Sequence, residues 1–359
     1  MARKKNSRLW ARLRVLCSSG LDLMCIAPDA FALVRELIPY DAATLYLTGP
    51  DGETYTTWQS SVLDCVRNVC ASEEFNRKED RYKISDLVMA APKVGHMLQP
   101  PRSYFASLAY QEIVRPAGQH HVLDVRLELD GRRVGLLMLL RAPGAGFDGD
   151  DVDEILRVAR YFEHAHRSAG CATLAEACLT EEAMVVANRG GEIMYMSGEA
   201  QVMLHELAQQ AHAPATPGRV PELCQRVIER LASSQQLDQL PVARMWAPGG
   251  IIEARAQWLG GPGGSAGPED LAERTPVGIF LKRVEPVPLR VWRSLQTAAL
   301  SPQQTEVAFW MGVGVRRDEV REKVGVSEAG LRDCLKVIYD RFDCSSEAAL
   351  AATLRGLAA

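Results

Sequence analysis

The sequence predicts two consecutive α+β regions followed by an all-α region of four short helices. The last sixty residues, 300–359, contain four segments with helix-start residues and with apolar residues at helical spacing. Upstream, apolar runs are joined by tight turns at Asp130-Gly131 and Arg189-Gly-Gly191, which is typical of antiparallel hairpins. With 359 residues, 47% of them hydrophobic, the chain is long enough for two or three domains.

Charge is distributed unevenly along the chain. The formal net charge is −4, yet residues 1–14 carry six basic side chains and no acidic one, which leaves −10 for the other 345 residues. We interpret the basic segment 1–19 as a solvated terminus leading into the first helix, with a DNA-touching arm as the alternative. Arg12 and Arg14 interrupt the apolar run near the terminus, and no run reaches the ~18 residues of a membrane span. We therefore expect a cytoplasmic protein outside the membrane.

Residues 20–166 have the element order of an α+β domain. The expected elements, together with the helix that precedes them, are helices 8–18 and 28–38, strands 42–47 and 54–58, helices 61–75 and 103–114, strands 122–129 and 134–141, and a long helix from Asp148. Pro28 is expected to begin the second helix. Segment 78–101 is rich in proline and glycine, and we expect it to be a loop that closes over a pocket.

The same segment resembles a GAF sensory domain. The motifs that carry the resemblance are Tyr110-Gln-Glu-Ile-Val-Arg-Pro116, Leu123-x-Val-x-Leu127, Gly135-Leu-Leu-x-Leu-Leu-Arg141 and Phe147 followed by acidic residues. This resemblance implies a pocket on one face of the sheet for a small-molecule ligand, which it does not identify. Four aromatic residues either pack in the core or line this pocket: Trp58, Tyr82, Phe105 and Tyr110.

A second α+β region, residues 183–285, resembles a PAS domain in its order of elements. The expected elements are strands 184–187 and 193–196, helices 198–210 and 221–233, and strands 241–246, 251–258 and 277–284. A connecting helix, 167–182, is expected before it. The apolar residues of that helix continue a spacing near 3.5 from Val152, a seam that either pairs with a second copy or packs within the chain. Residues 286–299 are expected to form a linker, stiffened by Glu285-Pro-Val-Pro288.

Residues 300–359 have the plan of a helix-turn-helix. Ser301 and Gln304 have the spacing of a capping box, so the first helix is expected to begin there and to run to about Gly312. The expected later helices are 317–324, a third one capped by Ser327, and a fourth one after Ser345-Ser346. Along the third helix, apolar residues fall on one face and charged residues on the other.

Several motifs in this region resemble the LuxR-type (GerE-type) DNA-binding domain. They are Leu300-Ser-Pro, Glu306-Val307, Gly314, Glu319-Val320, Gly325-Val326-Ser327-Glu328-Ala329, Leu335, Ile338-Tyr339 and Ser345-Ser346. The resemblance implies a four-helix domain whose third helix enters the major groove, usually as a dimer on a two-fold site. The DNA-binding positions that it implies are Arg317, Ser327, Gly330, Arg332, Asp333 and Lys336.

Departures from the family pattern fall where DNA would be touched. Gly330, Asp333, Cys334, Asp318 and Glu347 all stand where the family commonly has other residues. From residue 300 onward eight basic side chains face nine acidic ones, a net charge of −1, whereas phosphate contact favours an excess of cations. Arg332 and Lys336 still match commonly basic positions. Arginine can bond guanine with two hydrogen bonds, and Asp333 can accept one from cytosine.

No residue pattern indicates catalysis or a bound cofactor. The glycine-rich segment 260–264 lacks the Lys-Ser/Thr of a P-loop, so we expect no enzyme and no cofactor. The nine cysteines are scattered without a CxxC motif, and buried, reduced thiols are expected; Cys65 with Cys70, or Cys171 with Cys178, is the candidate redox pair. The histidines at 120–121 and at 164 and 166 lack further ligands at zinc spacing, so no metal is expected.

These observations predict a sequence-specific transcriptional regulator that binds double-stranded DNA as a homodimer. Its amino-terminal region would respond to an unidentified signal, such as a small molecule, and RNA polymerase is a further candidate partner. The alternative is an interaction protein whose acidic helix-turn-helix acts through another regulator or polymerase. A redox or metal sensor that uses the cysteines is the third hypothesis.

Overall fold

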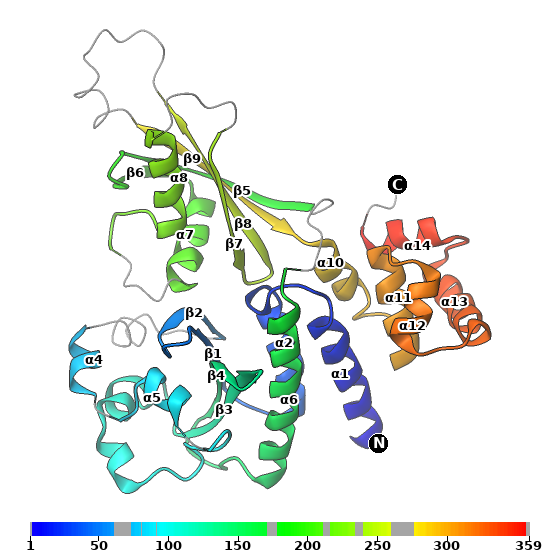
Figure 1. Cartoon of the computed structure of the whole chain (residues 1–359), viewed down its shortest axis with the longest axis horizontal. Coiled ribbons are helices and arrows are strands. Elements are labelled where there is room, and N and C mark those ends of the chain that lie inside the picture. The colour runs from blue at the N-terminus through cyan, green and yellow to red at the C-terminus, as the bar shows by residue number, and fades with distance from the viewer. Residues whose placement is uncertain are drawn as a thin grey trace. The chain divides into compact units, whose positions relative to one another are not determined.

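The computed structural model of this chain describes residues 2–60, 73–79, 81–90, 92–170, 178–210, 216–233, 240–259 and 276–356. They form two compact units. The sheet unit, residues 40–160 and 179–284, contains two antiparallel β-sheets, and the helical unit, residues 1–39, 161–178 and 285–359, is built from helices (Figure 1). Mixed α/β parts followed by a helical carboxy-terminal part agree with the predicted fold class at this level.

The first sheet has the strand order β2-β1-β4-β3 and is antiparallel throughout. Its strands are β1 (Ala42–Thr48), β2 (Thr54–Gln59), β3 (His121–Leu129) and β4 (Arg132–Arg141). Asp130 and Gly131 in the β3–β4 turn have φ values of 50° and 76°, which is the backbone that the predicted Asp-Gly hairpin turn requires. Alternation along β1 places Ala42, Thr44 and Tyr46 on one face of the sheet.

Short helical segments between β2 and β3 cover that face. They are α4 (Glu73–Lys78), α5 (Ile84–Met89), the 3₁₀ turn η1 (Arg102–Ala106) and the π-helical turn η2 (Ala109–Val114). The predicted loop 78–101 thus contains a helix, α5, because Leu87 and Val88 are buried. The single helix predicted for 103–114 is divided into the two segments η1 and η2. At the start of η2, the buried Glu79 carboxylate accepts a hydrogen bond from Ala109 N at 2.9 Å. The helix predicted for 61–75 lies largely outside the described residues.

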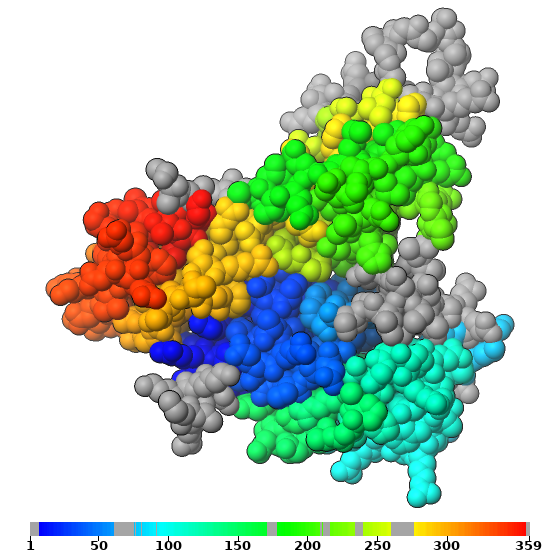
Figure 2. All heavy atoms as spheres, turned by 180° about the vertical axis from the view of Figure 1, so that it is seen from behind, coloured from blue at the N-terminus to red at the C-terminus, as the bar shows by residue number. Residues whose placement is uncertain are grey.

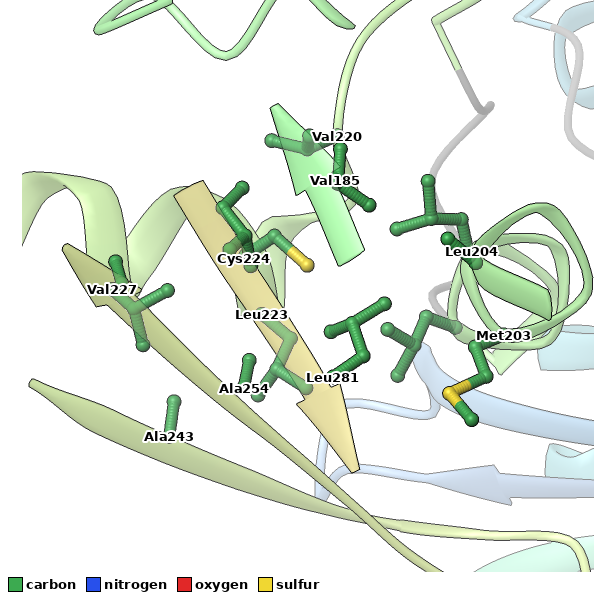
Figure 3. Packing of buried hydrophobic residues seen from close by; sticks show 14 of the residues in the cluster. Val185, Met203, Leu204, Val220, Leu223, Cys224, Val227, Ala243, Ala254 and Leu281 are labelled. Atoms are coloured by element: carbon green, nitrogen blue, oxygen red, sulfur yellow. The ribbon is translucent and has the colours of Figure 1, made fainter. Parts of the chain in front are cut away.

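The second sheet has the order β6-β5-β9-β8-β7. Its strands are β5 (Cys178–Ala187), β6 (Ile193–Met196), β7 (Val242–Ala247), β8 (Gly250–Trp258) and β9 (Val277–Glu285), and α7 (Gly198–Gln210) and α8 (Glu222–Ser233) contribute to the same core. Figure 3 shows how Leu223, Cys224 and Val227 of α8 lie over Ala254 and Leu281 of the sheet. The small alanines allow the helix to approach the strands closely.

The prediction of a connecting helix over residues 167–182 is wrong for residues 178–182. Residues 178–182 begin strand β5, and residues 171–177 lie outside the described part of the chain. Ion pairs hold this start of β5 on β9: Glu182 binds Lys282 at 2.7 Å and Glu181 binds Arg283 at 3.0 Å. The helix that precedes it, α6 (Gly149–Ser168), begins where the sequence predicts.

The helical unit contains α1 (Ala2–Cys17), α2 (Leu23–Leu37) and α10 (Val287–Ser294) besides the last four helices. Pro28 does not begin α2, because the side chain of Asp22 caps the helix by accepting a hydrogen bond from Met24 N at 2.8 Å. Pro28 therefore lies inside α2. Burial of the first turn of α2 stabilises this helix.

The prediction that residues 286–299 form a linker is also wrong. This segment contains α10, which follows Pro286 and carries Pro288 in its first turn, where the missing N–H of proline costs nothing. Leu289, Val291 and Trp292 of α10 are buried. The prolines therefore mark a helix start and not an extended joint. Within the described residues, the helices are too short or too polar to cross a membrane.

We predict that His166 makes the helical unit sensitive to acid. Its Nδ1 is buried without a hydrogen-bond partner among the described residues, and burial lowers its pKa, although nearby Asp22 opposes this. The unfolded chain, with a histidine pKa of about 6.5, then binds more protons than the folded chain, so stability falls as pH drops below about 6.5. Thermal melts should show a lower Tm at pH 5.5 than at pH 7.5. In His166→Gln this difference should shrink, and an unchanged difference would refute the assignment.

Candidate nucleic-acid interface

The carboxy-terminal helices are α11 (Pro302–Val313), α12 (Arg317–Val324), α13 (Glu328–Phe342) and α14 (Glu347–Leu354). The predicted capping box is confirmed: Gln304 N donates to Ser301 Oγ at 3.3 Å, and Ser301 N donates to Gln304 Oε1 at 2.9 Å. Gly314 ends α11 with φ 98°, a left-handed conformation that favours glycine. The four predicted helices are thus present.

A short turn fixes the direction in which α13 leaves α12. Gly325 adopts the left-handed conformation with φ 69° and ψ 40°, and its N–H donates to Arg321 O at 3.0 Å. Val326 N donates to the same oxygen at 3.1 Å, which closes the helix end. Ser327 Oγ then accepts a hydrogen bond from Gly330 N at 3.1 Å and caps α13.

One face of α13 is buried and packs against α11 and α14. Its buried residues are Leu331, Cys334, Leu335 and Ile338. Burial, with the nearby Asp333 carboxylate, raises the pKa of the Cys334 thiol, so this side chain stays protonated. Packing of this face leaves the opposite face of α13 open.

The open face of α13 consists of Arg332, Asp333, Lys336, Val337 and Asp340, all of them exposed. Figure 2 shows the surface to which this helix contributes, drawn from orange to red. The Arg332 ion pair with Glu328, at 3.6 Å, is also exposed and therefore weak. Sequence reasoning missed Val337, which is 44% exposed; its position four residues after Asp333 places it on this face.

The six predicted DNA-binding residues lie at three places. Arg332, Asp333 and Lys336 lie together on the open face, whereas Ser327 and Gly330 form the helix cap. Arg317 lies on α12, where a hydrogen bond with Tyr339 and an ion pair with Glu347 raise its pKa. It thereby joins α12 to α13 and α14. That these residues contact DNA stays a prediction.

Other cations of the four-helix region are engaged within the chain. Arg316 binds Asp318 at 2.9 Å and Glu319 at 3.1 Å. Arg355 donates to the carbonyl oxygens of Gly312 at 2.8 Å and Val313 at 3.1 Å, at the end of α11. The two carboxylates beside Arg316 offset its positive charge toward phosphate groups, whereas Arg355 keeps its charge but is held at the end of α11.

Basic residues of α1 bind α10, the residues that follow it, and α11. Arg12 Nη2 donates to Gln296 O at 2.9 Å, and Trp292 Nε1 donates to Arg12 O at 3.3 Å. Arg14 forms an ion pair with Glu306 of α11; burial raises the pKa of Glu306, and Arg14 opposes this. Neither a solvated terminus nor a DNA arm describes these two arginines, because Arg12 binds Gln296 and Arg14 binds Glu306 of α11.

The structure places several of the cysteines and histidines that the sequence singled out. The described cysteines are free thiols, and burial raises the pKa of Cys224 to about 12. Cys65, Cys70 and Cys171 lie outside the described residues. His120 Nδ1 is hydrogen-bonded to the Tyr110 hydroxyl at 2.7 Å, and the described residues hold no group of three His, Cys, Asp or Glu suited to a metal ion.

No protein-family model and no curated protein sequence matches the chain. Among solved structures, the phage VqmA–DPO complex is similar with a TM-score of 0.25 and 11% identity over 57% of this chain and 88% of that one. The Vibrio cholerae VqmA dimer, a LuxR-type receptor, has a TM-score of 0.17 and 13% identity over 48% of this chain and 81% of that one. The E. coli DhaR(N)–DhaL complex has a TM-score of 0.19 and 11% identity over 79% of this chain and 90% of that one. TM-scores this low do not establish a shared fold, so the assignment of a function rests on this chain's own residues.

We predict that Gly312→Leu destabilises the helix-turn-helix region. A Cβ at this position would lie 2.7 Å from Val291 Cγ1 of α10 and 2.9 Å from Leu354 Cδ1 of α14, so a larger side chain overpacks the contact. The expected cost is about 1–3 kcal/mol of unfolding free energy, measured by urea denaturation. Gly198→Leu is the matched control, because a Cβ there meets open space at the start of α7. Equal stability of the two variants would refute the close contact.

Proposed function

We propose that the chain is a LuxR-type, sequence-specific DNA-binding transcriptional regulator. The observation that carries the proposal is α13, whose buried face is fixed by α11 and α14 while its open face presents Arg332, Asp333, Lys336 and Val337. In the proposal, residues 300–359 bind DNA, and a GAF-like region, 20–166, and a PAS-like region, 183–285, receive the signal. The regulator acts in the cytoplasm as a homodimer and has no catalytic activity.

The open face of α13 offers different chemistry to different base pairs. Arg332 can donate two hydrogen bonds to guanine, and Asp333 can accept one from the cytosine amino group. Val337 can contact a thymine methyl group, and Lys336 can neutralise a phosphate. Since the Arg332–Glu328 pair is exposed, releasing Arg332 for DNA costs little. Base contacts would then provide the selectivity that the low positive charge alone cannot.

Helix α10 is the proposed route by which a signal reaches α11. Strand β9 ends at Glu285, and α10 begins at Val287, so the two are joined through Pro286 alone. Arg293 of α10 binds Asp29 of α2 at 2.7 Å and Glu285 at 2.7 Å. A shift of β9 or α2 would therefore move α10 and the helices packed on it. A coupling of about 1–3 kcal/mol is enough to change occupancy of a two-fold site.

An interaction protein is the second candidate, and the charge pattern favours it. The net charge from residue 300 onward is −1, and Arg316 and Arg317 are bound to acidic neighbours. Such a protein would use the same exposed helix to bind another regulator or RNA polymerase and would leave DNA untouched.

We predict that Arg332→Ala and Lys336→Ala each weaken DNA binding. On a duplex enriched from a genomic library, each loss of contact should cost about 1–3 kcal/mol of binding free energy. Lys336→Ala should also reduce the slope of log affinity against log salt by about 1. Fluorescence anisotropy at two salt concentrations measures both effects.

The matched control is Arg226→Ala, because Arg226 is an exposed arginine of α8 that pairs only loosely with Glu222, at 3.9 Å. Its affinity should equal that of the unchanged protein. If the double variant Arg332→Ala/Lys336→Ala binds DNA as well as the control does, the open face of α13 does not read DNA and the regulator proposal fails in this form. If the unchanged protein binds no duplex at all, the interaction protein is favoured instead.

A further inference from the structure

A cavity of about 700 Å³ lies against one face of the first sheet. Ala42, Thr44 and Tyr46 of β1 form its floor, and Tyr82, Leu87 and Tyr104 lie among the helical segments that line it. This volume suits a small molecule, since ligand pockets commonly measure roughly 300–1,000 Å³. Of the four aromatic residues that the sequence singled out, Tyr82 lines the cavity, Phe105 and Tyr110 pack against the adjoining core, and Trp58 is buried.

Two polar atoms among the lining residues are buried and lack hydrogen-bond partners in the described part of the chain. They are Thr44 Oγ1 and Gln119 Oε1. The amide nitrogen of Gln119 donates to Ala117 O at 3.3 Å, which leaves the amide oxygen as a free acceptor. Burying such an atom unpaired costs about 1–3 kcal/mol, so each atom is a position where a bound molecule would recover a lost hydrogen bond.

The buried residues of the lining are uncharged in the part of the chain that the structure describes. Its charged side chains, Glu53, Lys83 and Asp86, are at least partly exposed to solvent. Tyr104 is 2% exposed, and burial raises the pKa of its hydroxyl, which therefore stays neutral. A ligand that carried a charge into this space would lose its hydration. The nearest buried carboxylates, Glu79 and Asp124, already accept backbone hydrogen bonds from Ala109 and Met97, and a negative charge would be repelled by them.

We propose that this cavity binds an uncharged, largely apolar small molecule that hydrogen-bonds Thr44 and Gln119. The apolar body packs on Tyr46, Leu87 and Tyr104. The Thr44 hydroxyl donates a hydrogen bond to an acceptor on the molecule, and Gln119 Oε1 accepts one from a donor on it. Met138 lies beside Thr44 in the sheet register and also lines the cavity, so the hydrogen bond to Thr44 forms on an otherwise apolar floor.

The cavity would give the proposed regulator a signal of defined chemical class. That the bound molecule acts as a signal rests on the proposed function. Ligand binding itself is measured without DNA. If the chain binds the probe but no DNA, the regulator proposal is refuted and the cavity proposal stands. If the chain binds DNA but not the probe, the cavity proposal is refuted and the regulator proposal stands.

Two fluorescent naphthalene probes test the charge requirement on the full chain. Prodan is uncharged and carries a carbonyl acceptor, whereas 1-anilinonaphthalene-8-sulfonate is an anion of similar aromatic character. Titration should show blue-shifted, saturable prodan fluorescence, with affinity for the anion at least about tenfold weaker, a difference of about 1.4 kcal/mol.

Thr44→Val tests the hydrogen bond, because valine keeps the shape and removes the hydroxyl. Prodan affinity should fall about tenfold, while Tm without ligand should rise by a few degrees, since a buried unpaired hydroxyl is lost. Thr48→Val is the matched control: Thr48 Oγ1 on the same strand is also buried and has no hydrogen-bond partner among the described residues, but it does not line the cavity. It should gain stability and keep prodan affinity.

Ala42→Trp tests the location by filling the cavity from its floor, and it should abolish prodan binding. The proposal is overturned if prodan does not bind, if the anion binds equally well, or if Thr44→Val and Thr48→Val have the same prodan affinity. Should Ala42→Trp fail to fold, the comparison of the two threonine variants decides alone.

Discussion

Packing of α10 against α11 is the contact on which the proposed DNA-binding region depends. Val291 of α10 approaches Gly312 so closely that a glycine is needed there, and Trp292 is buried beside α1. Because α10 is also tied to α2 and to the end of β9 through Arg293, the first helix of the helix-turn-helix is part of the helical unit. The orientation of α13 therefore follows from contacts made well before residue 300.

Features encoded by neighbouring residues were predictable from the sequence. The capping box at Ser301, the left-handed glycine at 325 and the Asp-Gly turn at 130–131 each need only local chemistry, and each is present. The apolar spacing along α13 likewise predicted its buried and open faces. These signals act within one or two turns of the chain, so no knowledge of tertiary contacts was required.

Features that depend on distant partners were not predictable. The prolines near residue 286 indicated a stiff joint, yet burial of Leu289 and Trp292 makes the segment a helix. Arg317 matched a DNA-contacting position, yet Tyr339 and Glu347 bind it. In the candidate cavity, Thr44 and Gln119 carry no sequence signal at all, because only the fold shows that their oxygen atoms lack partners among the residues the structure describes.

The low positive charge limits how the proposed regulator can bind DNA. Cations that pair with Asp318, Glu319 and Glu347 contribute little to phosphate attraction, so non-specific affinity should be modest. Binding would then depend more strongly on a few base contacts from α13 and on the second copy of a dimer. The interaction protein differs from the regulator in one respect only, the identity of the molecule that the open face of α13 meets.

Selection from a genomic DNA library by the full-length protein, at a low and a high salt concentration, tests the central claim most directly. We predict enrichment of a two-fold sequence motif that persists at the higher salt, because base contacts by α13 and not phosphate attraction provide the selectivity. Enrichment of no motif at either salt concentration, with the protein folded and with prodan present to occupy the cavity, would contradict the claim that α13 reads DNA.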